Sequence, residues 1–454
     1  MAPFSFPGSS GLLNLLVSRD GGAEDPTTVA GFLSGQWHNP SDILSVLMLL
    51  GPDIVQKSIA QVSGRIVTPV AFSFGWVAYA ASTLLRVFGD GRLMPDADMA
   101  NATVIGAVSS HSRTTKSWIL GRLLRDEDDR VDGEMLTEQP HVPPAATVDI
   151  HQPQPPAYSE AILTKPAPEW EALRVTVYEV DDNPPVPHGV PTLDWVWYSG
   201  MAVIVIQLII SIIPWIVSDD WGIFLVTAAG TMLALIGASL PQWSEEKWAC
   251  PKKGGATVTI TQGNGSRHAV LILGKKGIGL DLEILAMGTR TARPTLFTRI
   301  VSAVLALLWI VLLINVAGLQ QNSWYLLGIG LLGSVQNLHA AGASRTPGAF
   351  GIHLKLVEII RDKRVASVLK KVEEKYPMAG TSLVPIFFPG GLRVKDEDLT
   401  YWRKAINDRM APNRYGTRID EPDWATLAEP REKTAASGDK NVVADEIRPI
   451  RQGT

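Results

Sequence analysis

The sequence has little of several things that would assign it to a common class of soluble protein. Its 454 residues contain one cysteine, Cys250, so neither an internal disulfide nor a thiolate metal cage can form within the chain. Its 41 Lys and Arg residues do not outnumber its 45 Asp and Glu residues, which argues against the basic face that nucleic-acid binding needs. Only 19% of the residues are charged and 46% are hydrophobic, a balance that indicates a membrane protein.

Recognisable catalytic and metal-binding motifs are missing as well. The histidines are scattered without HExxH or other ligand spacing, and no Ser/His/Asp grouping, nucleophile elbow or intramembrane carboxylate pair occurs. A GxGxxG stretch at 328–333 lies inside an apolar run, without the preceding strand of a dinucleotide site, so it indicates close helix packing. We expect no catalytic residue, no cofactor and no metal, and a protein that is not an enzyme.

Long uncharged apolar stretches are abundant instead. A bilayer core of about 30 Å needs ~20 apolar residues of helix, because lipid offers the backbone no hydrogen-bond partner. Five stretches meet this requirement, and tryptophans lie at several of their ends, where an indole prefers the headgroup layer. The sequence therefore predicts transmembrane helices at 66–88, 195–218, 221–243, 300–319 and 324–344.

The segment 41–62 allows two interpretations. Asp53 and Lys57 are four residues apart and would share one face of a helix, where they can pair. A charge at the membrane centre costs at least ~2.5 kcal/mol, so we prefer an interfacial or half-inserted helix with both groups at the water boundary. The alternative is a sixth span. The preceding residues 1–40 are expected to be flexible and lack the basic leader of a cleaved signal peptide.

The orientation follows from the lysines and arginines of the loops, since cationic loops tend to stay in the cytoplasm. The two short hairpin loops, at 219–220 and 320–323, contain no Lys or Arg, whereas 244–299 and the residues after 344 contain many. We therefore place the two hairpin loops outside and the longer connections in the cytoplasm. With five spans, the N-terminus would lie outside.

Several strand patterns fall on the expected cytoplasmic side. Residues 173–180, 256–261, 268–273 and 352–356 have strand character, and the Asn-Gly pair at 264–265 indicates a tight hairpin turn. We expect these strands to meet in one small cytoplasmic cap, so the fold class is an α-helical integral membrane protein of five spans, possibly six, with a mixed α/β cap and a disordered linker and tail. The parts outside the spans are an amphipathic segment (89–132), a Pro-rich disordered linker (133–172), a strand with a Pro-rich lead-in (173–194), a β-hairpin insertion (244–299), a strand/helix region (345–426) and a disordered tail (427–454).

One short recruitment motif lies in the Pro-rich linker. Pro155, Pro156 and Tyr158 form a PPxY element, whose extended backbone loses little entropy on binding and whose apolar side chains fit the aromatic groove of a WW domain. It resembles the docking sites of ubiquitin ligases that carry WW domains. The alternative is that a linker with this much proline contains PPxY by chance.

Five stretches carry a resemblance to a known group of proteins: SDILSVLMLLGPDIVQKSIAQ (41–61), TPVAFSFGWVAYA (68–80), residues 256–274 around QGNGSRHAVLILG, SVQNLHAAGASRTPGAFGIHL (334–354) and LVPIFFPGGL (383–392). They resemble uncharacterised polytopic membrane proteins of filamentous fungi that have no assigned function. The resemblance implies several membrane helices with cytoplasmic insertions, and it transfers no catalytic or binding residues.

The function we expect is that of a non-enzymatic scaffold or interaction protein whose partners are the lipid bilayer and a WW-domain ubiquitin ligase. A small-solute or ion transporter or channel is the alternative, and a membrane-embedded enzyme is the third class. Asp53, Lys57 and His339 are the weak candidates for a polar pathway in the membrane. Their convergence on a cavity would favour transport, whereas a dry bundle packed by glycines would favour the scaffold.

Overall fold

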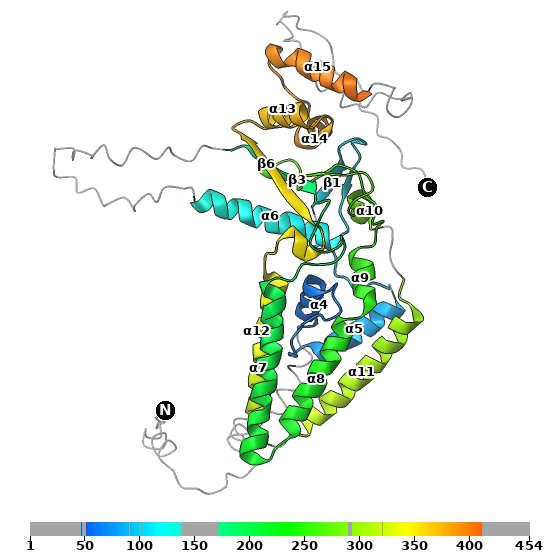
Figure 1. Ribbon diagram of the computed structural model, residues 1–454, viewed down its shortest axis with the longest axis vertical. Coiled ribbons are helices and arrows are strands. Elements are labelled where there is room, and N and C mark those ends of the chain that lie inside the picture. The colour runs from blue at the N-terminus through cyan, green and yellow to red at the C-terminus, as the bar shows by residue number, and fades with distance from the viewer. Residues whose placement is uncertain are drawn as a thin grey trace, which may run out of the picture.

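The computed structural model describes residues 47, 51–89, 91–99, 101–137, 171–288, 293–319 and 321–410. Long helices form one end of the molecule, and a mixed sheet with further helices forms the other (Figure 1). We call the first part the bundle and the second the sheet domain. The PPxY residues, most of the Pro-rich linker, the tail and nearly all of 1–50 lie outside the described residues.

The bundle is built on two helical hairpins. Asp194 caps the first helix by accepting a hydrogen bond from the Trp197 amide, and Thr295 caps the third in the same way. The two hairpin tips lie together, because Asn322 Nδ2 donates to Asp220 Oδ2 over 2.9 Å. The helices are α7 (Trp195–Ser218), α8 (Gly222–Ala238), continued by the short α9 (Pro241–Lys247), α11 (Leu296–Ala317) and α12 (Ser323–Gly342).

Within the part of the chain that the structure describes, three helices are long and apolar enough to cross a membrane: α7, α11 and the stretch Gly222–Lys247 that comprises α8 and α9. Helix α12 has 20 residues but carries more polar side chains, among them Gln336 and Asn337. The structure therefore supports a helical protein with three helices of membrane length, fewer than the five spans expected from the sequence.

The expected membrane helix at 66–88 is wrong in its first part. Residues 67–73, which we call the extended segment, are not helical, and helix α5 (Trp76–Phe88) begins only after Gly75, which has a φ of 92°. Pro69 opposes a helix there, because proline inside a helix removes a hydrogen bond and clashes with the preceding turn. The 13 residues of α5 extend about 20 Å, short of a bilayer core.

A short helix precedes the extended segment. Helix α4 (Pro52–Val62) lies within the expected interfacial segment 41–62, and it buries Val55 and Ile59 while exposing Asp53 and Lys57. This is an amphipathic helix whose charged side chains remain in contact with solvent.

The sheet domain contains one six-stranded mixed sheet of order β2-β1-β4-β5-β3-β6. The four strand segments expected from the sequence all lie in this sheet, and the β4–β5 hairpin turns at Gly263 and Gly265, which have φ values of 89° and 94°. Strand β3 lies between β5, to which it is parallel, and the antiparallel edge strand β6. The strands are β1 (Thr103–Gly106), β2 (Ser112–Thr114), β3 (Leu173–Val180), β4 (Val258–Thr261), β5 (His268–Leu273) and β6 (Leu354–Asp362).

Helices cover both faces of the sheet. Val175, Val177 and Leu271 face a core shared with α13 to α15, whereas Val258 and Ile272 belong to a second core that continues into the bundle as far as Trp309. The bundle and the sheet domain therefore share one hydrophobic core. The remaining helices are α6 (Trp118–Thr137), α10 (Leu282–Met287), the 3-10 helix η2 (Pro347–Phe350), α13 (Val365–Lys375), α14 (Ala379–Phe387) and α15 (Asp396–Met410).

Candidate functional site

The three polar residues expected to mark a membrane pathway do not come together. Asp53 is exposed on α4, and Lys57 lies 4.0 Å from Asp98 with half of its side chain exposed. His339 is exposed on α12, where its ring contacts that of Trp195 at 4.9 Å between centroids. Each of these groups therefore lies at the surface, and none lines an interior path.

The centre of the bundle holds the extended segment instead. Its residues from Thr68 to Ser73 are buried, so their backbone amides and carbonyls need partners within the protein. Asn337 of α12 supplies several: Oδ1 accepts from the Ala71 amide at 3.2 Å, and Nδ2 donates to the Ala71 carbonyl at 3.0 Å and to Ser73 Oγ at 2.7 Å. One buried amide side chain thus replaces a neighbouring strand.

Other polar side chains of the bundle hold the same segment. Gln207 Nε2 on α7 donates to the Phe72 carbonyl at 2.6 Å, and Ser334 Oγ on α12 accepts from the Phe74 amide at 3.3 Å. At the start of the segment, Ser239 Oγ accepts from the Thr68 amide at 3.3 Å. The polar residues of these apolar helices therefore form hydrogen bonds with an irregular stretch of backbone.

Four glycines make room for this segment. A Cβ atom at Gly200 would overlap the Pro69 carbonyl, and one at Gly333 would overlap the Phe72 carbonyl. Gly230 and Gly330 face the rings of Phe72 and Phe74 in the same manner. Two glycines of the GxGxxG stretch are thus used for close packing, as the sequence predicts, although their neighbour is an extended backbone and not another helix.

Aromatic rings fill the space beside the segment. Trp309 of α11 stacks on Trp76 at 5.4 Å between centroids and lies 6.2 Å from the ring of Phe72. Trp76 Nε1 donates to the Ala71 carbonyl at 3.1 Å, so its polar atom is satisfied as well. The middle of the bundle is therefore occupied by the chain's own backbone and rings.

A second group of polar side chains lies where the bundle meets the sheet domain. Lys247, at the end of α9, is buried and donates from Nζ to the carbonyls of Gln61 at 3.3 Å and Ser63 at 2.9 Å. Its ammonium also lies 5.9 Å from the ring centroid of Trp118 and 5.3 Å from that of Trp248. Two carbonyls at the C-terminal end of α4 thus accept hydrogen bonds from this buried amine, and two indole faces lie beside it.

Ion pairs extend this junction. Arg345 holds Asp194 through two hydrogen bonds, Nε to Oδ2 at 2.6 Å and Nη2 to Oδ1 at 2.7 Å. Arg122 of α6 pairs with Asp98 at 2.8 Å and donates to the Ala343 carbonyl beyond the end of α12 at 2.8 Å. The Arg345–Asp194 pair joins the residues after α12 to the start of α7, whereas Arg122 connects α6 of the sheet domain to the end of α12.

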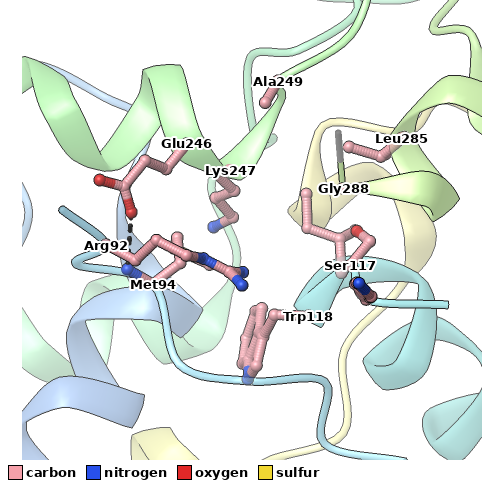
Figure 2. Close-up of a pocket in the computed structure, with 11 residues that line it drawn as sticks. Arg92, Met94, Ser117, Trp118, Glu246, Lys247, Ala249, Leu285 and Gly288 are labelled. Atoms are coloured by element: carbon pink, nitrogen blue, oxygen red, sulfur yellow. Dashed lines mark hydrogen bonds between the residues drawn. The ribbon is translucent and has the colours of Figure 1, made fainter. Parts of the chain in front are cut away.

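A small cavity opens beside Lys247 (Figure 2). Trp118, Met94 and Leu285 line it, and the Glu246 carboxylate beside it accepts from the Leu93 and Met94 amides at 2.7 and 2.8 Å. Its volume of about 30 Å³ accommodates one or two water molecules. A buried amine can act as a nucleophile or a base, but this cavity offers it no room for a substrate.

The sheet domain contains an acid–imidazole–hydroxyl series that no motif in the sequence predicts. His268 Nδ1 lies 2.6 Å from Asp128 Oδ1, and His268 Nε2 lies 2.9 Å from Thr176 Oγ1. The three residues are far apart in the chain and follow no motif. Thr176 is fully buried, so its hydroxyl cannot meet a substrate, and the series acts as a polar link between α6 and the sheet.

Among the described residues, no group of three or more His, Cys, Asp or Glu side chains could hold a metal ion. Comparisons with protein-family models, curated proteins and solved structures find no match for this chain. The resemblance to fungal membrane proteins remains a prediction from the sequence, and the function has to be argued from the geometry alone.

Proposed function

We propose that this protein is a multi-pass membrane protein that holds its sheet domain against the cytoplasmic face of a membrane and serves as a non-enzymatic scaffold. The outer surface of the bundle supports the membrane part of the proposal. Contiguous apolar surface of this extent is unfavourable in water and matches hydrocarbon. Its exposed side chains include Val205, Ile209, Ile216 and Val217 on α7 and Ile300, Val304, Leu307, Val311 and Ile314 on α11.

Four helices cross the membrane in this proposal. Helices α7, α8 and α11 have the length and composition for it. Helix α12 also crosses, because its polar Gln336 and Asn337 are buried within the bundle while Leu331, Val335 and Leu338 face outward. The two hairpin tips are in contact at one end; at the other, α7 and α12 adjoin the sheet domain, α8 continues through α9 toward it, and α11 begins beside the end of α5 (Figure 1).

The region 64–93 enters the bundle and returns to the same side. Before the extended segment, Gly64 packs against Trp248, and after α5 the Leu93 amide donates to Glu246. Both partners flank the end of α9, beside the sheet domain. We therefore propose a re-entrant segment in place of the fifth span, which puts α4 in the cytoplasm with the cationic loop 244–299.

The occupied interior of the bundle is the observation that carries the scaffold assignment. A transporter needs a polar route between its helices, whereas Asn337, Gln207 and Ser334 are bonded to the backbone of the extended segment. Hydrogen bonds from Arg122 to the Ala343 carbonyl and from the Arg345 amide to Asp126 of α6 then hold the sheet domain against the end of α12. Rigid presentation of a cytoplasmic domain suits a protein that positions other proteins.

Two features offer contacts to partners. The edge strand β6 exposes Leu356, Val357 and Ile359, and apolar side chains gathered on a surface often mark a protein contact. The PPxY residues Pro155, Pro156 and Tyr158 lie outside the described residues, and we retain their proposed binding of a WW-domain ubiquitin ligase.

One observation favours a second candidate function, that of a transporter. Within the described bundle, Gln207 Oε1, Thr231 Oγ1 and Ser302 Oγ are buried without hydrogen-bond partners. Such atoms are the coordinating groups that a cation or a polar solute would use. They are single oxygens on three different helices, however, and no described carboxylate accompanies them.

The test combines extraction, purification and flux. We expect the full-length protein to resist alkaline extraction from membranes and to co-purify with specific cytoplasmic proteins, while proteoliposomes that contain it show no solute flux. Release by alkali would overturn the membrane assignment. A flux that the Gln207→Leu substitution abolishes would replace the scaffold with the transporter.

A further inference from the structure

A second, larger cavity lies where the extended segment enters the bundle. It has a volume of about 250 Å³ and is bounded by residues 64–68 on one side and by the end of α8 and the start of α9 on the other. Arg65, Thr68, Ser239 and Trp243 are among the residues that line it. A water molecule occupies about 30 Å³, so the cavity can hold a group much larger than water.

Arg65 gives this cavity a positive charge. Its Nε donates to the Pro191 carbonyl at 2.9 Å, which holds the guanidinium in place. Among the described residues, no carboxylate lies within ion-pair distance of Arg65. A positioned guanidinium without a counter-ion favours an anion, and its planar fork of donors fits two oxygens of one phosphate group.

One hydroxyl group lies next to this cation on the cavity wall. Ser239 Oγ accepts from the Thr68 amide at 3.3 Å, which leaves its hydroxyl hydrogen available to donate to an oxygen-rich anion in the cavity. Thr68 is fully buried, so its hydroxyl is closed off from the cavity and is not part of the site.

The rim of the cavity is apolar and lies at the level of the bilayer interface. Ile66 is 94% exposed, and Trp197 Nε1 donates to the Val67 carbonyl at 3.2 Å. Trp195 and Tyr198, on the first turn of α7, are exposed at the same level, as expected of aromatic side chains in the headgroup layer.

We propose that this cavity binds the phosphate group of a glycerophospholipid headgroup, with Arg65 pairing its oxygens, Ser239 donating a hydrogen bond, and Ile66 contacting the acyl chains. The proposal rests on the proposed membrane function. The same chemistry would accept free inorganic phosphate, so the experiment has to distinguish the two sources.

The experiment measures ligand binding to the full-length protein purified in an uncharged detergent. Three probes are compared by titration calorimetry: dihexanoyl phosphatidylglycerol, dihexanoylglycerol, which lacks the phosphate, and inorganic phosphate. We expect the first to bind and the other two to bind at least tenfold more weakly. Equal binding of inorganic phosphate would confirm the anion site and overturn the lipid as its ligand. Equal binding of dihexanoylglycerol would overturn the phosphate site.

Matched variants test the residues. Arg65→Gln should weaken binding of the phosphatidylglycerol at least tenfold, and Ser239→Ala should weaken it severalfold. Arg299→Gln, which removes an exposed cation at the same end of the bundle, should bind like the wild type. Equal affinity of the Arg65 and Arg299 variants would overturn the site, and thermal unfolding confirms that each variant is folded.

The alkaline extraction and the binding measurements together distinguish failure of the headgroup site from failure of the proposed membrane function. If alkali extracts the protein from membranes, the scaffold proposal fails whether or not phosphate binds. If the protein resists alkali but Arg65→Gln leaves lipid binding unchanged, the headgroup site alone fails.

Discussion

The side-chain amide of Asn337 forms with Ala71 the same pair of hydrogen bonds that a neighbouring strand would form, one with its N–H and one with its carbonyl. The two residues are 266 positions apart in the chain. A polar residue in an apolar helix thus substitutes for β-pairing in the middle of the bundle. Several measurements can test this arrangement and its consequences.

Replacing Asn337 with leucine should destabilise the protein by about 2 to 4 kcal/mol, because the Ala71 amide would be buried without a partner and the Ala71 carbonyl would keep only the bond from Trp76 Nε1. Thermal unfolding of the purified protein in detergent measures the loss. Asn315→Leu is the matched control, since Asn315 is exposed and bonds only within its own helix, and it should change stability by less than about 0.5 kcal/mol. Equal effects of the two changes would contradict the proposed role of Asn337.

Alanine at Gly333 and alanine at Gly328 should have opposite effects. A Cβ atom at Gly333 overlaps the Phe72 carbonyl and lies close to Gln207 Nε2, so the extended segment would have to move. At Gly328 a Cβ atom meets nothing within 4 Å, so alanine should stabilise α12 by up to about 1 kcal/mol through its helix propensity. Unfolding temperatures of the two variants decide the matter, and the packing argument fails if Gly333→Ala unfolds at the same temperature as Gly328→Ala.

The proposed topology predicts which positions a membrane-impermeant maleimide reaches in intact cells. In a Cys250→Ala background, Asp220→Cys at a hairpin tip should be labelled from outside, whereas Lys276→Cys and Asp53→Cys should react only after permeabilisation. Asp53 is the decisive position, because the five-span arrangement would place it outside. Labelling of Asp53→Cys in intact cells would restore the fifth span.

Glycosylation gives an independent check on sidedness. Asn101 and Asn264 begin N-x-S/T sequons, and both belong to the sheet domain, which we place in the cytoplasm. Both should stay unmodified. A glycosidase-sensitive mass shift that disappears with Asn264→Gln would invert the whole orientation.

Low pH should weaken the contact between strands β3 and β6 through protonation of Glu171. Burial alone would raise the pKa of Glu171, but the hydrogen bonds from Arg174 at 2.9 Å and Arg361 at 2.7 Å lower it. Because the pKa is lowered in the folded state, its stabilisation is complete above the ordinary glutamate value of about 4.3 and is lost as the pH falls through the folded-state pKa.

Glu171→Gln should therefore reduce stability by about 1 to 2 kcal/mol at neutral pH and should flatten the fall in stability on acidification. Thermal unfolding across the acidic range measures both. Glu374→Gln, at an exposed position on α13, serves as the control. An unchanged acid profile in the Glu171 variant would contradict the assignment.

The PPxY element makes a prediction about turnover. A peptide of residues 152–162 should bind a WW domain, and Tyr158→Ala should weaken that binding about tenfold or more, because it removes an aromatic anchor worth roughly 1 to 2 kcal/mol. In cells the same substitution should lengthen the lifetime of the protein. Equal binding of both peptides to a panel of WW domains, with unchanged ubiquitination, would reduce the motif to an accident of composition.

Much of the sheet domain could be predicted from local sequence. Strands β3 and β5, the turn at Asn264 and Gly265, and helix α13 follow from alternation, turn chemistry and helical spacing. Strands β1 and β2 have four and three residues, too few for a periodic signal, and they were missed. The order of the strands in the sheet could not be predicted either, because it depends on pairing between segments that the bundle helices separate in the sequence.

The bundle interior could be predicted only in part. Hydropathy cannot distinguish an apolar helix from an apolar extended stretch, because both lack charge, so residues 67–73 looked like the start of a helix. Pro69 and Gly75 were the available signals. The polar residues Gln207 and Asn337 were visible, but their role depends on a backbone that is distant in sequence. The charge-based prediction of a polar pathway was wrong in position, since its residues Asp53, Lys57 and His339 lie at the surface.

The position of β3 in the sheet determines when the protein can finish folding. Its two neighbours, β5 and β6, are both synthesised later, β5 after the first helical hairpin and β6 only after the second. Until ribosomal synthesis has passed His268, β3 has no strand to pair with, and until it has passed Asp362 one edge of β3 stays open. The sheet can therefore be completed only after both helical hairpins have been synthesised. A chain truncated between the two hairpins exposes an apolar strand that quality-control factors can recognise.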